Sequence, residues 1–82
     1  AQNLRLNPDT GALVQEDTAL AYVAGDPNAA GNPPFPVGVA YDFNDTDPNT
    51  ATTMYVYDFD NDALGRVGSV GGSPVSPNTG QI

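Results

Sequence analysis

Two short acidic runs carry the residues in this sequence that are best suited to chemistry. The first is Asp42-Phe43-Asn44-Asp45-Thr46-Asp47 and the second is Asp58-Phe59-Asp60-Asn61-Asp62. Each places carboxylate or amide oxygens at alternate positions, and a curved loop of this kind supplies about half of the roughly six to eight oxygens that calcium needs. The first run is therefore a candidate calcium site, with a solvated turn as the alternative; no other cofactor is expected. Its ligands would be Asp42, Asn44, Asp45 and Asp47.

The second run departs from the calcium-binding pattern of an EF-hand. Such a loop has glycine at its sixth position and glutamate at its twelfth, where this chain has Ala63 and Ser69. We interpret residues 58–62 as a solvated turn whose Asp and Asn side chains bond their own backbone.

The rest of the composition argues against an enzyme. Paired carboxylates can hydrolyse glycosides when they face each other across a cleft, but both acidic runs are expected in turns. The chain has no His, Lys, Cys or Trp, and its serines lie in Gly- and Pro-rich surroundings with no base at hand. Acid-base and covalent catalysis thus lack their usual residues, and no enzymatic function is expected.

Two short motifs suggest attached sugars. Asn44-Asp45-Thr46 fits the acceptor pattern for N-glycosylation at Asn44, and Asp17-Thr18-Ala19 resembles a bacterial O-glycosylation pattern at Thr18. Attached or bound glycans are therefore among the expected partners.

Charge excludes two classes of partner. The formal net charge is -8, and Arg5 and Arg66 are the two basic residues. Nucleic acids and anionic membrane surfaces attract basic proteins, so neither is an expected partner. No run approaches the ~20 apolar residues of a membrane span.

The start of the chain and its thin core point to export and association. A small residue before a polar one, as in Ala1-Gln2, is typical of a chain after signal-peptide removal, so we expect a secreted, cell-surface protein. Leu, Ile, Val and Phe make up about a fifth of the residues, close to the ~20% below which charged chains tend to disorder. Without Cys there is no disulfide framework, and association with other copies is a common remedy.

The pattern of apolar residues and turns predicts an all-β fold. We expect one small domain over residues 1–82: an antiparallel sheet or sandwich of about five or six short strands, with hairpins like those of a propeller blade and open edges. It would consist of an N-terminal arm (1–13), a sheet core (14–70) and a Pro/Gly-rich segment (71–82). The candidate strands are 3–7, 12–15, 18–23, 37–42, 54–57 and 63–70.

The hairpin over residues 52–70 is expected at the centre of the sheet. Strand residues alternate between faces, so Tyr55 and Tyr57 should share one face and Met54 and Val56 the other. Phe35 lies between two prolines in a preceding loop, where it either pins the loop to the core or is exposed for a partner.

The end of the chain repeats its beginning. Leu6-Asn7-Pro8-Asp9-Thr10-Gly11-Ala12-Leu13 matches Val75-Ser76-Pro77-Asn78-Thr79-Gly80-Gln81-Ile82 position by position. A good β-turn can arise twice, but the match is also typical of a repeating β array, whose last strand prepares the place of the next unit's first strand.

A set of segments spread along the chain also suggests a relationship to a known family. In order, they are Asn3–Leu13, Leu20–Tyr22, Val39–Tyr41, Thr52–Asp58 and Leu64. Together they resemble a bacterial exported family catalogued as domain of unknown function 4394. The resemblance implies a β-propeller-like fold of repeated four-stranded units in proteins several times longer than this chain. The family has no assigned activity, so the resemblance implies no functional residues.

Open edges and a thin core favour a structural protein. Our leading hypothesis is an extracellular subunit that polymerises head to tail, its N-terminal strand Gln2 to Asn7 adding to a sheet edge of the next copy. Leu4 and Leu6 would enter pockets and set the register, with Arg5 and Phe35 also at the interface. The alternative is a monomeric binding module, stabilised by calcium, from a longer cell-surface propeller-like protein.

Overall fold

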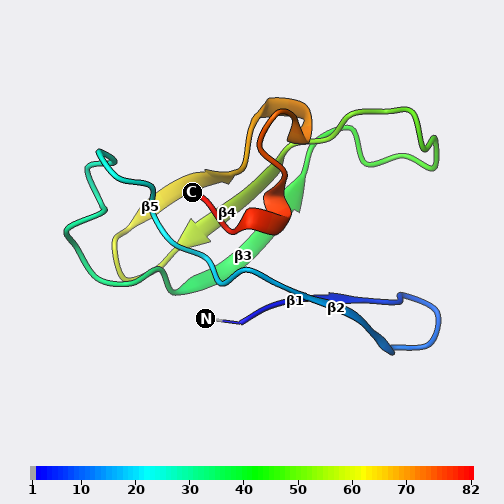
Figure 1. Ribbon diagram of the computed structural model, residues 1–82, viewed down its shortest axis with the longest axis horizontal. Coiled ribbons are helices and arrows are strands. Elements are labelled where there is room, and N and C mark those ends of the chain that lie inside the picture. The colour runs from blue at the N-terminus through cyan, green and yellow to red at the C-terminus, as the bar shows by residue number, and fades with distance from the viewer. Residues whose placement is uncertain (1) are drawn as a thin grey trace.

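The computed structural model describes residues 2–82, so Ala1 of the expected N-terminal arm lies outside the described residues. Two small antiparallel sheets contain the five strands, one pairing β1 with β2 and the other in the order β3-β4-β5 (Figure 1). Between residues 2 and 82 the only helical elements are two short 3₁₀ turns, η1 (Val70–Gly72) and η2 (Pro77–Thr79). This confirms the predicted all-β fold with open edges. The strands are β1 (Asn3–Leu6), β2 (Leu13–Asp17), β3 (Pro36–Tyr41), β4 (Met54–Asp58) and β5 (Ala63–Val67).

The hairpin of β4 and β5 lies where the sequence predicts it. Its register pairs Met54 with Val67 at one end and Asp58 with Ala63 at the other. The β-branched and aromatic residues of β4 favour a strand, and the acidic run after it provides the turn. Because β4 pairs with β3 on its other side, it is the central strand of the larger sheet.

Alternation along β4 divides the sheet into two faces. Val56 and Asp58 point to the inner face and are almost completely buried, whereas Tyr57 points outward and is exposed. The predicted separation of Met54 and Val56 from Tyr55 and Tyr57 is confirmed. The buried hydrophobic core is small, as its composition predicts, and consists of Leu20, Val56 and Val67 with Met54 and Ile82 packed against it.

The C-terminal segment covers part of this inner face and pairs with the chain that follows β2 (Figure 1). Ala21 N–H donates to Gly80 O at 2.9 Å, and Ile82 N–H donates to Ala21 O at 2.9 Å. The pairing is one isolated parallel bridge between Ala21 and Gln81. The expected strand over 18–23 is therefore wrong as a regular strand, because the left-handed turn at Gly80 interrupts the segment that pairs with it.

Gly80 fits closely against residues 18 and 19. It is buried, its φ is +67°, and a Cβ at this position would collide with the carbonyl oxygens of Thr18 and Ala19. Only glycine combines this backbone conformation with the absence of a side chain. The sequence of the second Pro-Asn-Thr-Gly turn is thus tied to where the turn docks.

The hairpin of β1 and β2 projects from the larger sheet (Figure 1). Asn7 Oδ1 accepts hydrogen bonds from the N–H groups of Asp9 (2.8 Å) and Thr10 (3.2 Å), and Gly11 follows with φ +72°. This side-chain cap and the left-handed glycine reverse the chain as the sequence predicts.

Candidate functional site

The predicted interface leucines lie on one exposed face of the projecting hairpin. Leu4 is 47% exposed and Leu6 is 52% exposed. Leu6 pairs across the hairpin with Leu13, which is 59% exposed. Burying such side chains is worth about 1.5–3 kcal/mol each, so this face is suited to contact with another molecule.

Arg5 points to the opposite face of the hairpin. Its Nη2 lies 3.1 Å from both carboxylate oxygens of Asp17, whose side chain is largely buried. Gln15 also donates to Asp17 at 2.7 Å. This ion pair holds β1 to β2, and the role of Arg5 at an interface stays a prediction.

The free edge of β3 offers a second exposed surface. Val39 and Tyr41 stand opposite Val56 and Met54 on the inner face, yet each remains about half exposed. A groove of about 320 Å³ separates this edge from the β1–β2 hairpin. Edge strands are commonly protected by charged residues, and β3 has none. The apolar part of the groove lining includes Leu4, Leu20, Val39, Tyr41 and Met54.

Phe35 stands beside the start of β3 with its side chain 56% exposed. Its backbone is firmly held, because its N–H donates to Asp58 Oδ1 at 2.9 Å and its carbonyl accepts from Phe59 N–H at 3.0 Å. The neighbouring Pro34 is the buried residue of this loop. Of the two roles considered for Phe35, the structure supports exposure over burial in the core.

Asp58 is almost completely buried, and the expectation of a fully solvated turn over 58–62 is wrong at this residue. Its Oδ2 accepts from the Tyr22 hydroxyl at 2.5 Å and from Asn61 Nδ2 at 2.6 Å. Its Oδ1 accepts from the N–H of Phe35 and from that of Asp60 at 3.1 Å. Its position two residues after Val56 in a strand was the sequence signal that it faces the core.

These hydrogen bonds shift two pKa values in opposite directions. Burial alone would raise the pKa of Asp58, but the bonds donated by Tyr22, Asn61 and the backbone outweigh it and lower the pKa to about 2. Burial, followed by the bond to Asp58, raises the pKa of Tyr22 to about 12. Asp58 is ionised and fully bonded at neutral pH, so it acts as a structural clamp between the Tyr22 segment, the Phe35 loop and β4.

The acidic loop predicted to bind calcium forms turns closed by its own side chains. Asp45 accepts from Asp47 N–H at 2.8 Å and from the Thr50 hydroxyl at 3.0 Å. Asp42 Oδ1 accepts from Thr53 N–H at 2.6 Å. Within residues 2–82 no three His, Cys, Asp or Glu side chains are grouped as metal ligands. Calcium binding at Asp42, Asn44, Asp45 and Asp47 stays a prediction.

Both predicted glycosylation residues are accessible. Asn44 is exposed in the acidic loop, and Thr18 is exposed immediately after β2. Accessibility is required for modification, and glycosylation at both residues stays a prediction.

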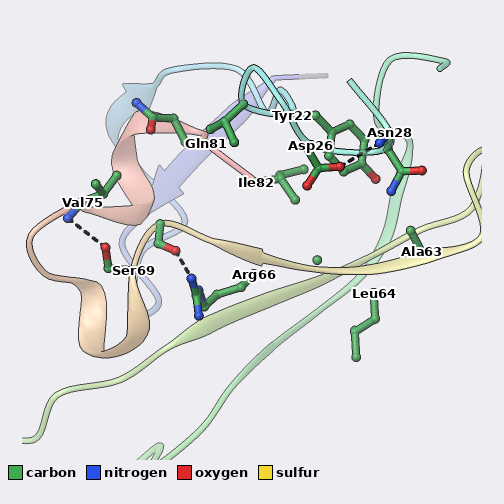
Figure 2. Close-up of a pocket in the computed structure, with 13 residues that line it drawn as sticks. Tyr22, Asp26, Asn28, Ala63, Leu64, Arg66, Ser69, Val75, Gln81 and Ile82 are labelled. Atoms are coloured by element: carbon green, nitrogen blue, oxygen red, sulfur yellow. Dashed lines mark hydrogen bonds between the residues drawn. The ribbon is translucent and has the colours of Figure 1, made fainter. Parts of the chain in front are cut away.

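A hollow of about 380 Å³ lies along β5 (Figure 2). Tyr22, Asp26 and Ile82 line it on one side of β5, and the side chain of Leu64 extends to the other side of this strand. Asp26 is the one carboxylate in the lining described for residues 2–82. The hollow therefore lacks the facing carboxylates that glycoside hydrolysis needs.

Comparison with known families adds one finding to this geometry. The family described as Domain of unknown function (DUF4394) matches residues 1–82. The chain belongs to this family. The resemblance inferred from its segments is thereby confirmed. No curated protein and no solved structure matches the chain.

Membership of DUF4394 assigns no activity. The resemblance to this family implies four-stranded units, whereas the larger sheet here has three strands. No helix within residues 2–82 has the length and apolar character required to cross a membrane.

Proposed function

We propose that this chain is a structural, extracellular subunit that polymerises head to tail into a filament by β-strand addition. The observation that carries the proposal is the row of exposed leucines on a projecting hairpin whose β1 strand has one free backbone edge. Main-chain hydrogen bonds to a neighbouring copy would supply affinity, and Leu4 and Leu6 would set the register. The proposal assigns no enzymatic activity.

The arrangement of the strands supports addition by the whole hairpin. β1 already pairs with β2 on one side, so it would contribute its other edge to the neighbouring copy. The acceptor would be a different surface from the donor, and such a heterologous contact extends indefinitely unless rotation closes it.

The distribution of charge supports contact through uncharged surfaces. Each copy carries a net charge of -8, which opposes close approach. Residues 27–41, which include Phe35 and β3, contain no charged side chain, and residues 67–82 contain none either. Copies can therefore meet through these segments without adding to the repulsion.

A matched pair of leucine substitutions tests the proposal. Leu4→Ser should weaken the association between copies by at least about tenfold, which corresponds to about 1.4 kcal/mol of contact energy, and the average particle mass in light scattering at micromolar concentration should fall accordingly. Leu64→Ser is the control, because Leu64 is 75% exposed on the outer face of β5. Equal assembly of both variants would contradict a role for the hairpin face.

The same measurement distinguishes the structural subunit from the alternative, a monomeric binding module. A monomeric binding module would scatter as a single chain in the unsubstituted protein, and its melting temperature would rise on addition of calcium. A large assembly whose stability does not respond to calcium would favour the structural subunit.

A further inference from the structure

The two repeated turns of the chain share a side-chain cap and a left-handed glycine, although their backbone bonds differ: Gly11 N–H donates to Asn7 O, whereas Gly80 N–H donates to Pro77 O. In the first, Asn7 Oδ1 accepts from Asp9 N–H at 2.8 Å, and Gly11 follows with φ +72°. In the second, Ser76 Oγ accepts from Asn78 N–H at 3.2 Å, and Gly80 follows with φ +67°. Both are a side-chain-capped Pro-x-Thr turn that ends in a left-handed glycine.

Their surroundings differ completely. The second turn is docked: Gly80 is buried against Thr18 and Ala19, and Thr18 N–H donates to Asn78 O at 3.0 Å. The first turn is free, because no atom lies within 4 Å of a Cβ placed on Gly11. One chain thus presents two copies of a docking turn and one place where such a turn docks.

The apolar residues beside the two turns differ in the same way, packed beside the docked turn and exposed beside the free one. Ile82, after the docked turn, packs against the core, and its side chain fills the space above Gly65. The matching Leu13, after the free turn, is 59% exposed. Leu6, which matches the half-buried Val75, is exposed as well. The free segment carries the same apolar anchors as the docked one, without the contacts.

We propose that segment Leu6–Leu13 of one copy docks on residues 18–23 of a second copy, where it replaces that copy's own segment Val75–Ile82. The inference rests on the proposed self-assembly and names its acceptor. In the single chain the C-terminal segment then occupies the site that a neighbour's hairpin takes in the assembly. The exchange resembles domain swapping.

The exchange would repeat the closest contact that the acceptor makes. A glycine without a side chain again meets the carbonyl groups of Thr18 and Ala19, and a leucine replaces Ile82 near Val56. Protein cores tolerate such aliphatic exchanges of similar volume well. The exchange buries Leu6 and Leu13 of the incoming hairpin in place of Val75 and Ile82 of the displaced segment, so the apolar area in contact with the core stays nearly the same.

Substitution of the free glycine tests this docking. Asn tolerates the left-handed conformation, so Gly11→Asn should leave the melting temperature of the single chain nearly unchanged. In the assembly its Cβ would collide with the acceptor carbonyls, and the sedimentable fraction should fall at least about tenfold. Gly25→Asn is the control, because Gly25 has φ +89° and nothing within 4 Å, and it should assemble normally.

Crosslinking identifies the acceptor without changing Gly11. The chain has no Cys, so Asp9→Cys gives one attachment point for a benzophenone label at the position that matches Asn78. Mixed isotope-labelled and unlabelled copies would distinguish crosslinks between chains from those within a chain. We expect crosslinks between copies to fall on residues 17–20, and crosslinks confined to other segments would overturn this acceptor.

The outcomes separate this inference from the proposed function. If Gly11→Asn assembles as well as Gly25→Asn, the docking of the turn is wrong while polymerisation stands. If the unsubstituted protein does not assemble at all, the proposed function and this inference are both wrong.

Discussion

The hydroxyl of Tyr22 donates a 2.5 Å hydrogen bond to Oδ2 of Asp58, 36 positions further along the chain. Tyr22 lies in the segment that pairs with the C-terminus, and Asp58 ends the central strand β4. The bond therefore joins the segment that contains Tyr22 to the larger sheet. In a domain with so small a hydrophobic core, a buried polar contact of this kind carries a large share of the specificity of packing.

Removal of the Tyr22 hydroxyl should destabilise the fold. Tyr22→Phe should lower the free energy of unfolding by about 2 kcal/mol, the usual value for a hydrogen bond to a charged group, as measured by urea denaturation. Tyr57→Phe is the matched control, since Tyr57 also donates to a carboxylate at 2.5 Å, that of the exposed Asp62. A loss as large for Tyr57→Phe would show that burial of Asp58 is not what matters.

Acid should unfold the protein through Asp58. Its pKa is about 2 in the folded protein and 3.8 ordinarily, so the folded state favours the ionised form. The stabilisation is present above about pH 4 and is lost as the pH falls through about 2. Thermal melts across this range should show a decline that is much weaker in Asp58→Asn, which should also be less stable than the unsubstituted protein at neutral pH.

Alkali should act through Tyr22 with the opposite sign. Its pKa is raised from 10.0 to about 12, so the folded state favours the neutral phenol. This contribution is present below about pH 10 and is lost as the pH rises through about 12. Melting temperatures followed from neutral pH into this range should fall for the unsubstituted protein and fall less for Tyr22→Phe.

The two repeated glycines should differ in their tolerance of alanine. Gly80→Ala places a Cβ against two backbone carbonyls that cannot move aside, so severe loss of stability is expected. Gly11→Ala meets open space and should cost only the left-handed strain of about 1–2 kcal/mol. Comparison of the two melting temperatures checks the prediction, and equal losses would contradict the docked and free assignments of the turns.

Salt should promote assembly of this acidic chain. Ionic strength near 0.15 M shortens the screening length to about 8 Å, which weakens the repulsion between copies of charge -8. Light scattering should therefore rise from low to moderate salt. A fall over the same range would indicate that attraction between opposite charges drives the association.

Local patterns predicted both hairpins, because alternation and turn residues act over neighbouring positions. The β4–β5 pairing and the Asn7-capped turn are examples. The docking of Gly80 on Thr18 and Ala19 was not predictable in this way, since two irregular segments far apart in the chain leave no periodic signal. The burial of Pro34 in place of Phe35 depends likewise on tertiary packing.

At the candidate site, the sequence pattern predicted the apolar face of Leu4 and Leu6 but did not predict the burial of Asp58. Leu4 and Leu6 alternate with polar residues, which marks one apolar face whatever lies opposite. Asp58 belongs to an acidic run that looks solvated, and its burial is offset by donors from Tyr22 and from the backbone of Phe35. Those donors come from distant segments, so residue type alone pointed to the surface.

Electron microscopy of the purified protein at micromolar concentration and moderate salt tests the central claim most directly. Polymerisation by strand addition predicts long, unbranched fibres that disappear in Leu4→Ser and persist in Leu64→Ser. An absence of fibres, together with light scattering from a single species of 8.5 kDa, would contradict it.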